Sequence, residues 1–128
     1  MRVLLDAHAF IWWVLDTPNL SDHAREIIGD GENDVILSTA SCYEIAYKAD
    51  MGRLELPEPP ETYIRSRLVA NNFRSLPVDL SHALRAATLP GIHRDPFDRI
   101  LVAQAQIEDL PILTADVAIS RYDVETIW

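Results

Sequence analysis

The sequence predicts an α/β protein, a three-layer α/β/α sandwich in which helices cover both faces of a central parallel sheet. Short apolar runs alternate with helical patterns along the 128 residues. The runs are continuously apolar and lack the apolar–polar alternation of a strand with one wet face, as is typical of strands buried on both faces. This length fits one domain, so residues 1–128 are interpreted as a single unit.

Five apolar runs are the predicted strands. Arg2–Leu5 and Val35–Ser38 are the clearest, because Val, Ile and Leu dominate both segments. The other three strands are expected at Phe73–Val78, Pro111–Thr114 and Val124–Ile127.

Helical spacing of apolar residues, together with capping residues, predicts six helices between these strands. Ser21 and Ser81 are the expected N-caps of the second and the fifth helix. The helices are Ala9–Val14 (ending near Pro18), Asp22–Ile28, Ser41–Asp50, Glu61–Asn71, a segment from Ser81 to about Leu89, and Pro96–Asp109.

Composition narrows the class of protein. A single cysteine, Cys42, excludes an intrachain disulfide and a four-cysteine zinc site and fits a cytoplasmic location. No apolar run is long enough for a membrane span, and no signal peptide or membrane association is expected. The net charge of −9 argues against broad electrostatic binding of nucleic acid, although residues 48–99 hold eight of the eleven cations. Scattered surface ion pairs are the favoured interpretation of these cations.

Carboxylates occur where predicted strands or loops lead into helices. Asp6 directly follows the first strand, Asp116 comes two residues after the fourth, Asp95 and Asp98 open the long helix, and Glu44 lies just after the second strand. Because the carboxyl ends of parallel strands share one edge, these side chains are expected to converge there. Converging carboxylates repel unless a cation lies between them. Mg²⁺ or Mn²⁺ prefers such oxygens and can assist phosphoryl displacement.

Each acid also has a capping explanation. Asp6 can cap the first helix, Ser41-x-x-Glu44 matches a capping box, Asp95 precedes a proline as a good N-cap does, and Asp116 can cap a short turn. Taken singly, capping is favoured over catalysis. Their expected convergence at one edge of the sheet nevertheless favours a catalytic site. One carboxylate can both cap a helix and act in catalysis.

Other polar and aromatic residues give weaker signals. Ser38 and Thr114 end strands beside the predicted crevice. A hydroxyl there can hydrogen-bond a carboxylate or a metal-bound water, or it can cap the following helix. Phe10, Trp12 and Trp13 can stack on bases, but their helical spacing favours a place in the core or at an interface. The same interpretation applies to Tyr43 and Tyr47, which share a helix face. Four histidines lack metal-ligand spacing and are interpreted as surface or packed residues: His8, His23, His82 and His93.

Four stretches, in order along the chain, resemble a known family. They are LLDAHAFIWW at 4–13, LSTASCYEIA at 37–46, HRDPFDRILVAQA at 93–105 and LTAD at 113–116. Together they resemble the PIN domain, in particular VapC-like toxin ribonucleases of prokaryotic toxin–antitoxin pairs. The third stretch is the most specific. Ala7 departs from the Thr or Ser that often follows the first acid in that family.

The resemblance implies a Rossmann-like α/β/α sandwich and Mg²⁺- or Mn²⁺-dependent cleavage of RNA. It also implies a VapB-like antitoxin partner and a homodimer. Carried over by position, the catalytic acids would be Asp6, Glu44, Asp98 and Asp116, with all but Glu44 holding the metal. Asp95, which is additional in this subgroup, would lie just outside the metal ligands, as would Ser38 and Thr114.

Other functions remain to be weighed. Arg94 and Arg99 can contact phosphate, although an ion pair is favoured for each. A receiver-type phosphoacceptor needs paired acids after the first strand and a lysine after the last, yet Asp6 is unpaired and Lys48 is the only lysine. An Asp-x-Asp phosphatase lacks its second acid. A non-catalytic PIN-like module that binds RNA or protein stays open, and a metal titration distinguishes it.

Overall fold

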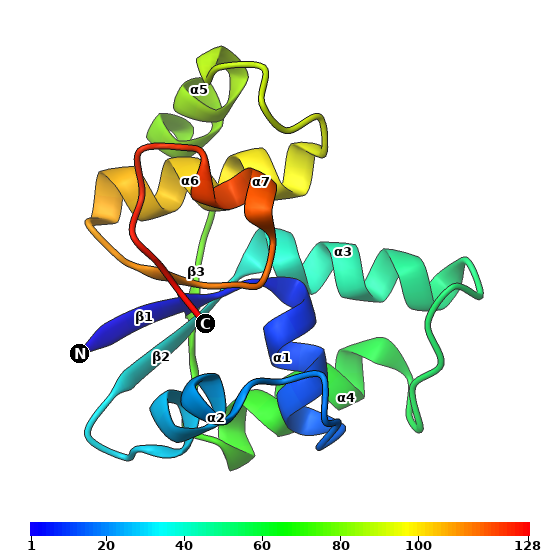
Figure 1. The fold of residues 1–128 in the computed structure, drawn as a ribbon. Coiled ribbons are helices and arrows are strands. Elements are labelled where there is room, and N and C mark those ends of the chain that lie inside the picture. Colours follow the sequence, from blue (N-terminus) through cyan, green and yellow to red (C-terminus); the bar gives the residue numbers. More distant parts are fainter.

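The computed structural model, which describes residues 1–128, contains one sheet of five parallel strands in the order β3-β2-β1-β4-β5 (Figure 1). This confirms the predicted fold class. The three outer strands are shorter than expected, so the long central strands β1 and β2 carry most of the pairing. The strands are β1 (Arg2–Leu5), β2 (Asp34–Ser38), β3 (Arg74–Leu76), β4 (Ile112–Leu113) and β5 (Thr126–Ile127).

Helices cover both faces of the sheet. In Figure 1, α1, α2 and α4 lie on one side and α5, α6 and α7 on the other, while α3 contacts α1, α4 and α6. None of the helices has the length and apolarity needed to cross a membrane. The helices are α1 (Ala7–Val14), α2 (Asp22–Gly29), α3 (Thr39–Asp50), α4 (Pro60–Ala70), α5 (Leu80–Thr88), α6 (Pro96–Glu108) and α7 (Val117–Ser120).

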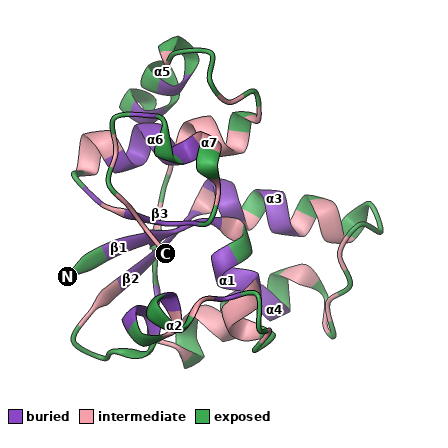
Figure 2. Cartoon of the chain, in the orientation of Figure 1, coloured by how far each residue is buried: buried purple, intermediate pink, exposed green.

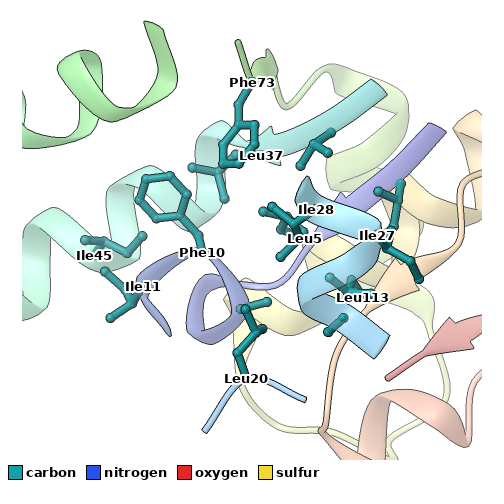
Figure 3. Packing of buried hydrophobic residues seen from close by; sticks show 14 of the residues in the cluster. Leu5, Phe10, Ile11, Leu20, Ile27, Ile28, Leu37, Ile45, Phe73 and Leu113 are labelled. Atoms are coloured by element: carbon teal, nitrogen blue, oxygen red, sulfur yellow. The ribbon is translucent and has the colours of Figure 1, made fainter. Parts of the chain in front are cut away.

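The central strands are apolar throughout because both of their faces are covered. Val3 and Leu5 pack into the cluster formed with α1 and α2, whereas Leu4 packs into the cluster formed with α6 and α7. All three side chains are fully buried, and Figure 2 shows buried residues along β1 and β2. The larger cluster also holds Phe10 of α1, which meets Phe73 edge-on at 6.3 Å between ring centroids (Figure 3). This packing fixes α1 directly beside the carboxyl end of β1.

The start of α3 differs from the prediction because an earlier hydroxyl caps the helix. The Oγ of Ser38 accepts the backbone N–H of Ala40, so α3 begins two residues before the expected start at Ser41. The prediction of a capping box formed by Ser41 and Glu44 is therefore wrong. Glu44 lies in the second turn of α3, and its carboxylate does not cap the helix.

The starts of α5 and α7 also differ from the prediction. Asp79, rather than Ser81, caps α5: its carboxylate accepts the backbone N–H of His82, while the His82 ring accepts that of Asp79. The turn expected after Asp116 is the short helix α7. The N-caps that were expected at Asp6, Ser21 and Asp95 are confirmed.

Candidate active site

Asp6 connects the central strand to the first helix and lies at the centre of the carboxyl edge. Its Oδ1 accepts the backbone N–H of Ala9 at 2.7 Å, and the residue is only 5% exposed. Burial raises the pKa of Asp6 above its ordinary value, although hydrogen bonds from Thr114 and Ala9 oppose the shift. A buried carboxylate with one oxygen used by a cap leaves the other oxygen available to its neighbours.

Thr114 joins two of the predicted acids. Its hydroxyl donates to Oδ2 of Asp6 and accepts the backbone N–H of Asp116 at 3.0 Å. Oδ1 of Asp116 in turn accepts the N–H of Ala118 at 2.8 Å and caps α7. One hydroxyl at the end of β4 thus fixes the position of Asp6 relative to Asp116.

His93 bridges Asp116 and Asp98. Its Nδ1 accepts the backbone N–H of Asp95 at 3.1 Å, so the ring hydrogen must lie on Nε2. That Nε2 is 3.0 Å from Oδ2 of Asp116 and 3.1 Å from Oδ2 of Asp98. A single N–H therefore faces two carboxylates from different elements.

The electrostatics of the site reflect its crowded negative charge. Burial raises the pKa of Asp98 to about 7, with the charges of Asp95, Glu44 and Asp116 adding to the shift and His93 opposing it. Burial also pushes the pKa of Asp116 upward. Hydrogen bonds from His93 and the N–H of Ala118 outweigh that effect and hold the pKa below its usual value. The two acids that share His93 are thus driven toward different protonation states.

Glu44 reaches the same edge from α3. It is 5% exposed, and its Oε2 lies 2.6 Å from Nζ of Lys48 one turn later. Its charge contributes to the raised pKa of Asp98, which places the two carboxylates within electrostatic range. Lys48 is the one side-chain cation that pairs with a predicted catalytic acid.

The remaining predicted residues occupy the border of the site. Asp95 caps α6 through the N–H of Phe97, and Ser38 caps α3. The side chain of Arg94 is exposed and makes no hydrogen bond. The guanidinium of Arg99 instead donates to the backbone oxygens of residues 86, 89, 90 and 93, so it anchors the loop before α6, and we do not propose a phosphate contact for it.

The site offers ligands for a divalent cation. Ligand atoms of His93, Asp98 and Asp116 lie within 4.8 Å of one another, and the partly exposed carboxylates supply the hard oxygens that Mg²⁺ and Mn²⁺ prefer. The pKa of Asp98 is raised mainly by burial, and the neighbouring carboxylates add to the shift, so a bound cation would favour its charged form.

A second group of similar residues lacks this property. Asp79, His82 and Glu108 also cluster, but the buried ring of His82 uses Nδ1 for the N–H of Asp79 and faces Glu108 with Nε2. These contacts tie α5 to α6 and use both ring nitrogens, as the contacts of His93 do, so neither histidine is assigned as a metal ligand. The expectation that His82 is a packed residue is confirmed.

Fold and site together define a class: a parallel α/β protein with a cluster of carboxylates at the carboxyl edge of its sheet. The model of the PIN domain family matches residues 3–125. The chain therefore belongs to the PIN domain family.

Individual relatives agree with this assignment. The chain is 36% identical over 61 residues to Ribonuclease VapC16 of Mycobacterium tuberculosis, a match that covers 48% of this chain and 43% of that protein. The fold is similar to VapBC2 from Rickettsia felis bound to a DNA fragment from their promoter, with a TM-score of 0.73, 11% identity and coverage of 99% of this chain and 98% of that chain. A toxin-antitoxin complex from Klebsiella pneumoniae gives a TM-score of 0.66 and 16% identity over 98% of this chain and 96% of that chain.

Sequence reasoning missed His93 and the site cation Lys48. The interpretation of His93 as a surface or packed residue is wrong, because its ring bridges two acids. Its place two residues before the cap Asp95 was the available signal. Tyr43 and Tyr47 do not lie in the core, because they are 62% and 46% exposed and stack on each other. Their interpretation as interface residues stays a prediction.

Replacing Arg99 with glutamine is expected to lower the free energy of unfolding by about 2–4 kcal/mol, because four backbone oxygens lose their donor. Urea unfolding followed by circular dichroism measures this. The matched control is Arg94→Gln in the same segment, which should change stability by less than about 0.5 kcal/mol. Equal effects of the two changes would show that Arg99 does not anchor the loop.

The metal-free protein is expected to lose stability as pH rises from about 4 to 7. Asp98 has a pKa of about 7 in the folded protein and an ordinary value of 3.8, so the folded state binds more protons in that window. In chelator, Asp98→Asn should remove up to about 3 kcal/mol of this loss between pH 5 and pH 8, measured by urea unfolding at those two pH values. Parallel pH profiles for the two proteins would contradict the assigned environment of Asp98.

Proposed function

We propose that the chain is a metal-dependent endoribonuclease that hydrolyses phosphodiester bonds of RNA and serves as the toxin of a toxin–antitoxin pair. The observation that carries the proposal is the convergence of Asp6, Glu44, Asp98 and Asp116 at one edge of the sheet, with the pKa of Asp98 raised to about 7. Membership of the PIN family and the similarity to a protein named as a ribonuclease support the reaction type.

In this proposal Asp6, Asp98 and Asp116 hold Mg²⁺ or Mn²⁺, and Glu44 completes the acidic set. When bound, such an ion would acidify an attacking water and stabilise the charge on the leaving oxygen. Thr114 orients Oδ2 of Asp6 through its hydroxyl. Because the pKa of Asp98 is raised to about 7, binding of a cation would favour loss of its proton near neutral pH.

His93 would act as a positioning residue. Its Nε2–H holds the facing oxygens of Asp98 and Asp116, and its Nδ1 is fixed by the N–H of Asp95. Tyr122 anchors the same loop, because its hydroxyl accepts the N–H of His93 and donates to the oxygen of Pro90. Asp95 would therefore support the site through His93 and α6.

The proposal extends to partners. We place a VapB-like antitoxin and a second copy of the chain in the functional assembly, because solved structures with this fold include a toxin-antitoxin complex. The matched relative is covered over less than half of its length, so its activity is a guide to this proposal only. An RNA substrate and a single unpaired cysteine fit a cytoplasmic location for one PIN domain of residues 1–128.

Incubation of the protein with total cellular RNA and Mn²⁺ or Mg²⁺ should yield discrete cleavage products. Asp98→Asn should reduce the cleavage rate by about a hundredfold, because a metal ligand and its charge are lost. Electrophoresis with 5′-end mapping measures this, and excess chelator should abolish the products. Asp123→Asn, which removes an exposed acid away from the site, is the matched control and should cleave normally.

Two outcomes would contradict the proposal. Equal cleavage by the native chain and Asp98→Asn would mean that another residue or a contaminant cuts the RNA. Absence of cleavage, together with no effect of Mn²⁺ on thermal stability, would favour a non-catalytic binding module instead.

A further inference from the structure

A hollow of about 320 Å³ lies immediately beside the acidic site. It is formed by α1, α3 and the loop that follows α3, and Glu44 lines both the hollow and the acidic edge. A substrate bound at the acids would therefore lie next to this hollow. A second hollow, of about 440 Å³, lies at the opposite, amino edge of the sheet, and carries the acids Asp109, Asp123 and Glu125.

The floor of the first hollow is apolar and one wall is aromatic. Ile11, Ile45 and Leu54 supply the floor, and the Trp12 indole forms part of the wall. The Trp12 ring meets Trp128 edge-on at 5.8 Å between centroids and lies 5.5 Å from the ring of His8. Because these neighbours hold the indole in place, the wall is a preformed surface for a flat ring.

The rim of the hollow carries positive charge, which is scarce in this acidic chain. Lys48, the only lysine, is fixed beside Glu44 at 2.6 Å and remains 38% exposed. Arg53 is exposed, and its guanidinium makes no hydrogen bond within the protein. Two cations above an apolar floor match a ligand that has a phosphate and a planar, weakly polar ring.

We propose that this hollow binds one nucleotide of a single-stranded RNA substrate, with its base against Trp12 and a phosphate at Lys48 and Arg53. The inference rests on the proposed ribonuclease function and adds a subsite to it. Charge distinguishes this occupant from a purely apolar protein segment, which would leave the Arg53 guanidinium without a partner and Lys48 with Glu44 alone.

The test measures RNA binding and cleavage separately. Asp98→Asn protein in chelator is titrated with a short, unstructured, fluorescently labelled RNA of mixed sequence, and anisotropy gives Kd. Arg53→Gln and Trp12→Leu, added to this background, should each weaken binding by about tenfold, whereas Trp12→Phe should retain most of it. The matched control is Arg74→Gln, which removes one cation paired with Asp34 at the amino edge and should leave Kd unchanged.

The same substitutions in the otherwise native chain test the role in cleavage. With Mn²⁺, Arg53→Gln and Trp12→Leu should raise KM by a similar factor and leave kcat within about twofold. If RNA is bound and cleaved but these variants match Arg74→Gln in Kd and KM, the subsite is wrong and the ribonuclease proposal stands. If the native chain neither binds nor cleaves RNA, both proposals fail.

Discussion

Carboxylates from separate elements meet at the carboxyl edge of the sheet, and the electrostatic repulsion among them is the constraint that this fold must satisfy. Each of the main acids has a donor that offsets part of its charge. Thr114 donates to Asp6, Lys48 lies beside Glu44, and Nε2–H of His93 is shared by Asp98 and Asp116. Burial, with a further contribution from the charges of Asp95, Glu44 and Asp116, still raises the pKa of Asp98 to about 7. A bound divalent cation would supply the missing charge.

The scaffold places these groups through ordinary secondary-structure chemistry. Asp6, Asp95 and Asp116 each start a helix by accepting a backbone N–H, so the contact that begins the helix also orients the carboxylate. Capping and catalysis are therefore compatible interpretations of one residue. The loop that carries His93 is fixed from the other side by Arg99 and Tyr122. Stability of this loop and geometry of the site are accordingly coupled.

Much of this arrangement could be predicted from the sequence because its causes are local. Continuous apolar runs indicated the buried strands, and acids that follow those runs must meet at one edge. Helix starts were less predictable, because several neighbouring residues can act as the N-cap. Ser38 rather than Ser41 caps α3, and Asp79 rather than Ser81 caps α5. The bridging role of His93 depends on how the loop before α6 folds, because its ring must lie between Asp98 and Asp116, which come from separate segments. The hollow beside Glu44 likewise forms only when α1 and α3 pack together.

Calorimetric titration with Mn²⁺ tests most directly whether the cluster is a cation site that includes Asp98. Near pH 7 the account predicts saturable binding with release of protons from Asp98, detected as a dependence of the binding enthalpy on the ionisation enthalpy of the buffer. Asp98→Asn should bind more weakly and lose this proton release. Absence of binding, or equal affinity and proton release in the variant, would contradict the account.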